Sequence, residues 1–399
     1  MNNLYNMFLA VLIASAGAAT AQQGKIDALE KQLKAIQDQM NQLSATGGGE
    51  VGTHGLSFGF YGEFKWINKN HGKDKFDPHR FVLIPHYKLS DYANLVAEIE
   101  LEHGGVKDTD TSDGSGDPRF DGELELEQFY VDAEITDWAT WRAGISLIPV
   151  GRVNQHHEPD QFYSVHRPIM YKYIIPSTWM ESGMGFHGDL SEVVTDGLGY
   201  EVYLSQGLTS AYATHTDGSW KPRDTRPNPR ESDGNDSLAA SLKLDYKKGG
   251  FSGSVSTYQT SYESSNGSSD LGLYDVEASY LFGEGSVLAG IELIADYAWW
   301  DIDDPSKIVG AGATQTGDEM NGYRLEVAYH MPQGDNELVP FFRAEGYDLE
   351  SGSAGSSSNY LTYGAMYKFG DNWEIKAGVR QSLDYDSSTE VTAGVGIQF

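Results

Sequence analysis

From residue 56 onward, the sequence alternates between apolar and polar side chains with a period of two. One early run places Leu56, Phe58, Phe60, Phe64 and Trp66 on one face and Ser57, Tyr61, Glu63 and Lys65 on the other. This period is that of a β-strand whose two faces meet different surroundings. A soluble β-sandwich shows the same alternation, so the period alone leaves two fold classes open.

The connections between these runs favour one class. Short joints are expected at 89–91, 136–137, 195–197, 247–250, 283–285, 332–335 and 370–371, and longer polar joints at 68–77, 103–121, 149–182, 206–236, 261–270, 301–319, 350–358 and 384–388. Because short and long joints alternate, they predict about sixteen strands, each near the roughly ten residues that a tilted membrane strand needs. We therefore expect an all-β fold, a transmembrane antiparallel β-barrel spanning 51–399 with short turns in the periplasm and long loops outside.

Composition agrees with an exported membrane barrel and excludes other classes. The formal charge of −30 argues against a nucleic-acid partner, and the absence of cysteine excludes disulfides and cysteine-ligated metals. Aromatic residues at the ends of apolar stripes predict girdles at the lipid headgroups, although strands are enriched in aromatics in any case. The expected girdle residues are Tyr297, Trp299, Trp300, Tyr323, Tyr329, Tyr363, Tyr367 and Trp373.

The N-terminal residues predict three segments ahead of the barrel. An apolar run, Leu9–Ala16, followed by Ala19-Thr-Ala21 indicates a signal peptide at 1–21, although no Lys or Arg precedes the run. A heptad seam predicts a periplasmic coiled-coil stalk at 22–45, or alternatively one amphipathic helix packed on the barrel. The seam consists of Ile26, Leu29, Leu33, Ile36, Met40 and Leu43. Residues 46–50 would form a glycine hinge.

Residues 149–182 interrupt the strand pattern with charge, histidine, proline and large apolar side chains. A loop of more than about 15 residues within a regular β pattern is usually functional or disordered. This one is too apolar for a disordered linker, so we expect it to pack inside the barrel.

The same segment carries a resemblance. The matching residues are Pro149, Val150, Gly151, Arg152, Asn154, His157, Glu158, Pro159, Phe162, Val165, Arg167, Pro168, Ile174, Ile175, Pro176, Trp179, Glu181, Gly183, Gly185 and Gly188. In this order they resemble the phosphate-selective porin family. The resemblance implies an outer-membrane trimer of water-filled barrels for passive diffusion, with the third external loop narrowing the pore. The terminal Phe399 is similar to the aromatic end that barrel-insertion machinery recognises.

Candidate pore residues come from the loop and from strand parity, which is the face of a strand on which the period of two places a residue. The expected constriction consists of Arg152, Asn154, His157, Glu158, Arg167 and Lys172. The expected lumen wall includes Lys65, Arg80, Glu98, Glu100, Glu102, Arg142, Arg343 and Arg380. Positive charge on the loop opposite Glu98, Glu100 and Glu102 would create a transverse field; alternatively, Arg167 and Glu158 pair with each other or with the wall to hold the loop.

The side chains expected on the lumen wall carry both charges, with a slight excess of carboxylates. This mixture predicts weak selectivity that leans towards cations, rather than the phosphate preference that the family name implies. An anion- or phosphate-selective channel, and an outer-membrane anchor or adhesin without channel activity, remain alternatives. The expected partners are outer-membrane lipid, lipopolysaccharide, and small hydrophilic solutes or ions.

No catalytic, cofactor-binding or metal site is expected from the sequence. The adjacent His156 and His157 precede Pro159, so they cannot form the i, i+4 pair of a metalloprotease helix. The acidic run 108–117 lacks the bidentate Glu and flanking helices of an EF-hand. No strand–elbow–helix context supports a serine nucleophile, so an enzyme is not predicted.

Overall fold

A computed structural model of the chain describes residues 55–70, 72–104, 122–208, 225–226, 237–264, 267–308, 317–351, 356–384 and 388–399. The predicted signal peptide, stalk and glycine hinge lie outside these ranges. Among the described residues, no helix is both long and apolar enough to cross a membrane.

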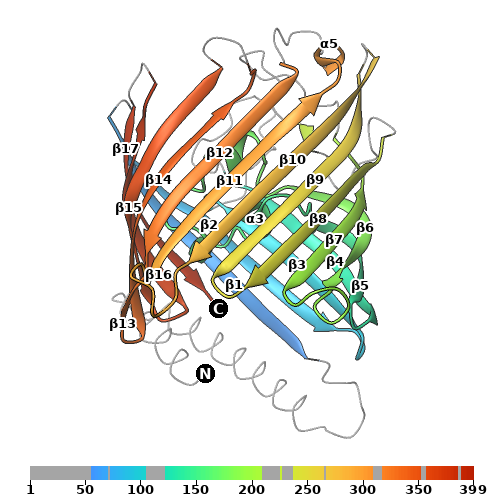
Figure 1. Cartoon of the computed structure of the whole chain (residues 1–399), viewed down its shortest axis with the longest axis horizontal. Helices are drawn as coiled ribbons and strands as arrows, with labels where there is room; N and C mark the ends of the chain where they lie inside the picture. The colour runs from blue at the N-terminus through green and yellow to red at the C-terminus, as the bar shows by residue number, and fades with distance from the viewer. Residues whose placement is uncertain are drawn as a thin grey trace, which may run out of the picture. The chain divides into compact units, whose positions relative to one another are not determined.

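One antiparallel sheet contains all the described strands (Figure 1). They are β1 (Leu56–Lys69), β2 (Lys75–Lys88), β3 (Ala93–Glu102), β4 (Leu124–Thr136), β5 (Ala139–Leu147), β6 (Met180–Asp189), β7 (Leu198–Ser205), β8 (Ala239–Lys248), β9 (Phe251–Ser264), β10 (Gly267–Leu281), β11 (Ile291–Ile302), β12 (Glu319–Tyr329), β13 (Met331–Gln333), β14 (Asn336–Asp348), β15 (Ser357–Phe369), β16 (Trp373–Ser382) and β17 (Thr389–Gln398). The short helices are α3 (Arg152–Gln155), η1 (Pro159–Gln161), α4 (Met170–Tyr173) and α5 (Pro305–Ile308).

The sheet closes into a barrel of sixteen strands. β12 and β13 are two parts of one strand, because both pair with β14 and only His330 separates them. β17 pairs with β1, so this sheet of described strands has no free edge. The all-β barrel with sixteen strands is therefore confirmed, and closure satisfies the backbone hydrogen bonds that an open edge would leave unpaired.

The predicted sorting of connections by length is only partly right. The connections 103–123, 148–179, 206–238 and 303–318 are long, and each begins at the end of a strand that runs away from the side of the barrel where β1 begins and β17 finishes (Figure 1). The expected loop at 261–270 is wrong, because β9 and β10 run on to Ser264 and from Gly267. The polar stretch stays in the sheet because Tyr262 and Leu271 turn inward and are fully buried. The expected loop at 68–77 shrinks to 70–74.

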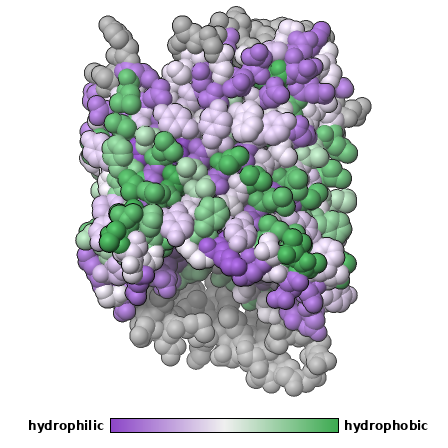
Figure 2. Space-filling model, in the orientation of Figure 1, coloured by the Kyte–Doolittle hydropathy of each residue, from purple (hydrophilic) through white to green (hydrophobic). Residues whose placement is uncertain are grey.

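The two faces of the wall differ in character, as the alternation predicted. Glu98 and Glu100 are buried inside the barrel, whereas Ile99 between them is exposed on the outside. On the face in view, Figure 2 shows hydrophobic side chains across the middle of the wall and hydrophilic ones near both ends. An outward apolar band with polar rims is the surface that lipid requires of a barrel.

The inner face is not uniformly polar. Inward-facing side chains of β9 to β12 form a fully buried apolar surface, here called the apolar inner wall. It consists of Tyr258, Leu271, Leu273, Ala298, Trp300 and Met320. The placement of Trp300 in an outer girdle is therefore wrong, because parity turns it inward while its neighbour Trp299 stays on the outer face.

Candidate pore constriction

The connection between β5 and β6, residues 148–179, folds into the barrel and is here called the inward loop; its helix α3 lies within the ring of strands in Figure 1. Its apolar side chains pack on the apolar inner wall. The buried members are Ile148, Val150, Val153, Phe162, Met170, Tyr171, Ile174, Ile175 and Trp179. Burial of this many apolar side chains, each worth about 1.5–3 kcal/mol, fixes the loop against one side of the lumen.

Close approach between loop and wall depends on one glycine. A Cβ on Gly322 of β12 would lie 2.8 Å from Cγ1 of Ile174 and 2.9 Å from Cβ of Met170. Contacts this short are not tolerated, so the absence of a side chain lets α4 lie against the strand. Trp300 adds a hydrogen bond at the same place, donating from Nε1 to the backbone oxygen of Ile174 over 2.8 Å.

Polar groups of the wall also hold the loop backbone. Lys376 donates to the carbonyl oxygen of Phe162 over 2.7 Å, and Glu345 accepts the backbone N–H of Ile169 over 2.6 Å. Arg80 donates to the carbonyl oxygen of His157 over 2.6 Å. These charged side chains keep their charge but point at the loop backbone, so parity alone does not show which of them face open space in the lumen.

Two of the predicted site residues are structural. Asn154 is fully buried: its amide nitrogen donates to the oxygen of Ile148, and its amide oxygen accepts the N–H of Trp179. Arg343 is also fully buried and donates to Ser164 of the loop over 2.8 Å. Both side chains hold the inward loop in place, and their place in the constriction and in the lumen wall stays a prediction.

Between the loop and strands β1 to β4 lies a compact group of ionisable side chains, here called the ion-pair layer. It comprises Tyr61, Glu63, Arg80, Glu98, Glu127 and His157, all of them buried. Arg80 contacts Glu63 over 2.6 Å, and Tyr61 donates to Glu98 over 2.8 Å. Nε2 of His157 lies 3.6 Å from both Glu98 and Glu127. His157 therefore touches the acidic wall directly, whereas the expected field spanned an open gap.

Two members of this layer escaped sequence analysis. The alternation places Tyr61 on the inner face but predicts no role for it, and Glu127 is absent from the predicted lumen wall. The alternation of Glu123, Glu125 and Glu127 with Leu124 and Leu126 is visible in the sequence and could have placed Glu127 inside. A register shift in β4 opposite Glu98 and Ile99 then turns both Glu127 and Gln128 into the lumen, which a strict period of two cannot predict.

Two polar hollows are lined by neighbours of the ion-pair layer, one by Lys65 and Glu100 and the other by Gln128 and His156. The outer hollow, at the long-loop end, has a volume of about 560 Å³. Its charged lining consists of Lys65, Lys69, Lys75, Arg167, Lys172, Arg380, Asp77, Glu100, Glu102 and Glu390. The inner hollow, at the short-turn end, has a volume of about 820 Å³. Its charged lining consists of Arg142, Lys247, Asp189, Asp196, Glu201 and Asp245, so the outer hollow is basic and the inner one acidic.

The remaining predicted residues divide between these places. Lys65, Glu100, Glu102, Arg167, Lys172 and Arg380 line the outer hollow, and Arg142 lines the inner one. Arg167 donates to Ser177 within the loop, so it braces the loop as well as facing the hollow. Arg152 and Glu158 line neither hollow. The backbone N–H of Arg152 instead donates to Glu277 of the wall over 3.0 Å.

His157 gives the ion-pair layer a testable pH dependence. Burial acts to lower the pKa of His157, but the carboxylates of Glu127 and Glu98 outweigh it and raise the pKa to about 9. The pKa of an unfolded histidine is about 6.5. The protonated His157 ring therefore stabilises the folded state fully below that pH, and this stabilisation is lost as pH rises through about 9. Arg80 does not titrate in this range. We expect channel current to become noisier between about pH 8 and pH 10, measured in planar bilayers.

In the His157→Gln variant this alkaline change should be absent, because glutamine carries no titrating charge. Equal pH profiles in wild type and variant would show that the change has another source.

A closed barrel of sixteen strands with an external loop folded into its lumen is the architecture of outer-membrane porins. The solved structures similar to this chain have that fold. OmpF of Salmonella typhi in complex with daunomycin has a TM-score of 0.57 at 12% identity, covering 86% of this chain and 97% of that one. An anion-selective porin from Comamonas acidovorans has a TM-score of 0.55 at 12% identity, covering 86% and 99%. OmpT of Vibrio cholerae in its trimer form has a TM-score of 0.53 at 10% identity, covering 86% and 99%.

Comparison of sequences is less specific. No protein-family model matches the chain, so the resemblance to phosphate-selective porins is not confirmed at that level. The chain is 29% identical over 339 residues to an uncharacterized protein of Aquifex aeolicus, covering 79% of this chain and 72% of that protein.

Proposed function

We propose that the protein is a porin of the bacterial outer membrane that allows passive diffusion of small hydrophilic solutes or ions. The observation that carries the proposal is a closed barrel that contains two polar hollows and an inward loop whose ion-pair layer adjoins the lining of both. The outward apolar band would contact lipid, and the polar rim at the long-loop end would face lipopolysaccharide.

We further propose weak selectivity that leans towards cations. Within and beside the ion-pair layer, the carboxylates of Glu63, Glu98, Glu100 and Glu127 face the cationic Arg80, Lys65 and His157, and the inner hollow is acidic. Rings of carboxylates favour cations. The alternative, an anion-selective channel, is favoured by the outer hollow, whose lining holds six Lys and Arg side chains against four carboxylates.

Single-channel recording in a salt gradient tests both proposals at once. Purified protein is expected to produce discrete conductance steps in planar bilayers, with a small reversal potential of the sign that cation preference gives. A strong reversal potential of the opposite sign would establish the anion-selective alternative. Folded protein without conductance steps would instead support an anchor or adhesin.

The oligomeric state is proposed to be a homotrimer, by analogy with the trimer form described for OmpT. Crosslinking of the detergent-solubilised protein tests this, with a ladder ending at three chains as the expected result.

A further inference from the structure

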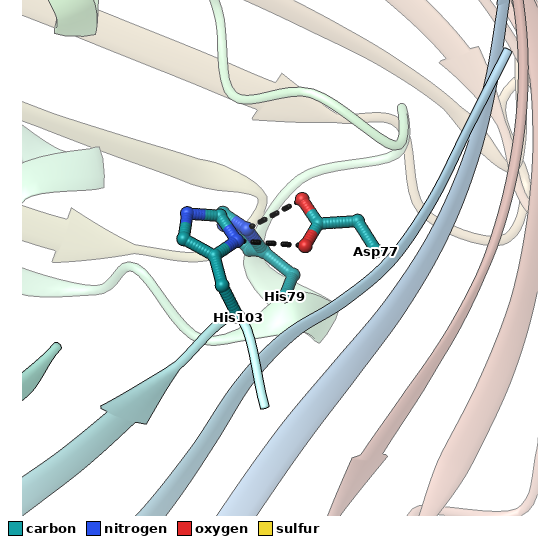
Figure 3. A group of neighbouring side chains, drawn as sticks. All are labelled: Asp77, His79 and His103. Atoms are coloured by element: carbon teal, nitrogen blue, oxygen red, sulfur yellow. Dashed lines mark hydrogen bonds and ion pairs between the residues drawn. The ribbon is translucent and has the colours of Figure 1, made fainter. Parts of the chain in front are cut away.

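Three side chains that can bind a metal ion converge on the inner wall at the outer hollow. Asp77 and His79 belong to β2 and His103 follows β3, and all three line the hollow (Figure 3). Their ligand atoms lie within 4.8 Å of one another. Nδ1 of His103 is 2.7 Å from Oδ1 of Asp77, and Nδ1 of His79 is 3.5 Å from Oδ2. Both rings therefore point the same nitrogen at one carboxylate.

A bulge in β2 creates this convergence. Along β1 the register moves two residues, from Glu63 to Lys65, while its partners in β2 move three, from Arg80 to Asp77. The extra residue coincides with Pro78, which cannot donate to the ladder and so suits a bulge. The strand bends at this point, and Asp77, His79 and Arg80 are all turned away from the outer surface.

The backbone of His103 is shaped to join them. Its φ angle of 51° makes it a left-handed residue, which is uncommon for a side chain other than glycine. Its backbone N–H donates to the oxygen of His79 over 3.0 Å, which ties the two histidines together. No local pattern in the sequence indicates a metal site here, because the three side chains come from two strands and meet only through the bulge and this turn.

One unused atom points to a ligand. Nδ1 of His79 is buried and has no hydrogen-bond partner, although it faces the carboxylate. In a tetrahedral zinc site with bonds of about 2.0–2.1 Å, neighbouring ligand atoms lie ~3.3 Å apart. The observed 3.5 Å between His79 Nδ1 and Asp77 Oδ2 is close to this spacing and too long for a good hydrogen bond.

We propose that Asp77, His79 and His103 bind a divalent transition-metal ion of the zinc class at the outer mouth of the lumen. Two imidazoles and one carboxylate suit zinc, nickel or copper, whereas calcium and magnesium prefer oxygen ligands alone. With these three ligands from the described part of the chain, the fourth position of a tetrahedral ion faces the outer hollow. Oε2 of Glu102 lies 3.9 Å from Nε2 of His103, on the side where a second carboxylate orients a metal-bound histidine.

The ammonium group of Lys75, 3.0 Å from Oδ2 of Asp77, is the group that the ion would displace. Lys75 is half exposed, so it can swing into the hollow without leaving a buried charge behind. A second group, Glu98, Glu127 and His157, has similar spacing. There, however, both His157 nitrogens already have partners, in Tyr61 and the backbone oxygen of Asn154, so it is the weaker candidate.

Calorimetric titration of ZnCl₂ into chelator-stripped, detergent-purified full-length protein tests the proposal without relying on channel activity. Wild type is expected to bind one zinc per chain, and CaCl₂ should not compete. The double variant His79→Gln with His103→Asn should bind about a hundredfold more weakly, because two of three ligands are lost. Asparagine is chosen at residue 103 because it tolerates the left-handed backbone. The matched control is His86→Gln, which removes an exposed histidine from the same strand and should bind as wild type does.

For each variant, a difference in SDS-gel mobility between unheated and heated samples shows that the barrel is folded. If the double variant does not fold, Asp77→Asn alone serves instead, with the same expected loss. Undiminished zinc binding by either folded variant would overturn the proposal, as would absence of stoichiometric binding by wild type. Loss of binding in His157→Gln, with retention in the double variant, would place the ion in the ion-pair layer and reject the site proposed here.

Discussion

Replacing Arg80 by serine is expected to raise single-channel conductance by on the order of twofold and to strengthen cation preference. Arg80 is the cation at the centre of the ion-pair layer, where it contacts Glu63 and holds the backbone oxygen of His157. Its removal leaves buried carboxylates without their main counter-ion and releases one tether of the inward loop. Breaking a buried ion pair by removing one partner costs about 3–5 kcal/mol, so the layer should hydrate and widen rather than stay packed.

The matched control is Arg380→Ser. It also removes one positive charge, but from the outer hollow, where Arg380 pairs with Glu390 over 2.7 Å. A small change in reversal potential with little change in conductance is expected there. If Arg80→Ser leaves both conductance and reversal potential as in wild type, the solute does not pass through the ion-pair layer.

The barrel could be predicted because its cause is local. Each strand has its own alternation of apolar and polar residues with a period of two. Glu98, Ile99 and Glu100 already show which face is turned outward, because only Ile99 is exposed. The number of strands follows from counting runs between turns, although the expected loop at 261–270 is wrong and the one at 68–77 is longer than the loop observed. Ser261 and Asp270 looked like loop residues from composition, yet their strands pair through them because the neighbouring apolar side chains are buried inside.

The site could be predicted only in outline because its causes are not local. Parity places Arg343 and Arg80 inside equally well, but it cannot show that the loop buries the first and that the second belongs to the ion-pair layer. The bulge at Pro78 and the register shift opposite Glu98 each move a side chain to the other face. These shifts depend on pairing with a neighbouring strand, which a pattern along one strand does not contain.

The expected effect of Trp300→Ala is the detachment of the inward loop from a barrel that stays closed. Trp300 is fully buried, lies against Trp179 and Tyr258, and donates to the backbone oxygen of Ile174. Truncating a buried tryptophan costs about 3–5 kcal/mol, and the carbonyl of Ile174 also loses its hydrogen bond. We expect a lower melting temperature, faster proteolysis within 148–179, and flickering conductance.

Trp299 provides the control because it is the next residue and faces the other way. It stacks on Tyr274 on the outer face, with ring centroids 5.2 Å apart, so Trp299→Ala removes similar aromatic area without touching the loop. Steady conductance and slow proteolysis are expected in that variant. If both variants flicker alike, the loop is held by the barrel as a whole. If only Trp300→Ala does so, the apolar inner wall is what keeps the loop in the lumen, and the polar tethers from Arg80, Lys376 and Glu345 set its position without being sufficient to hold it.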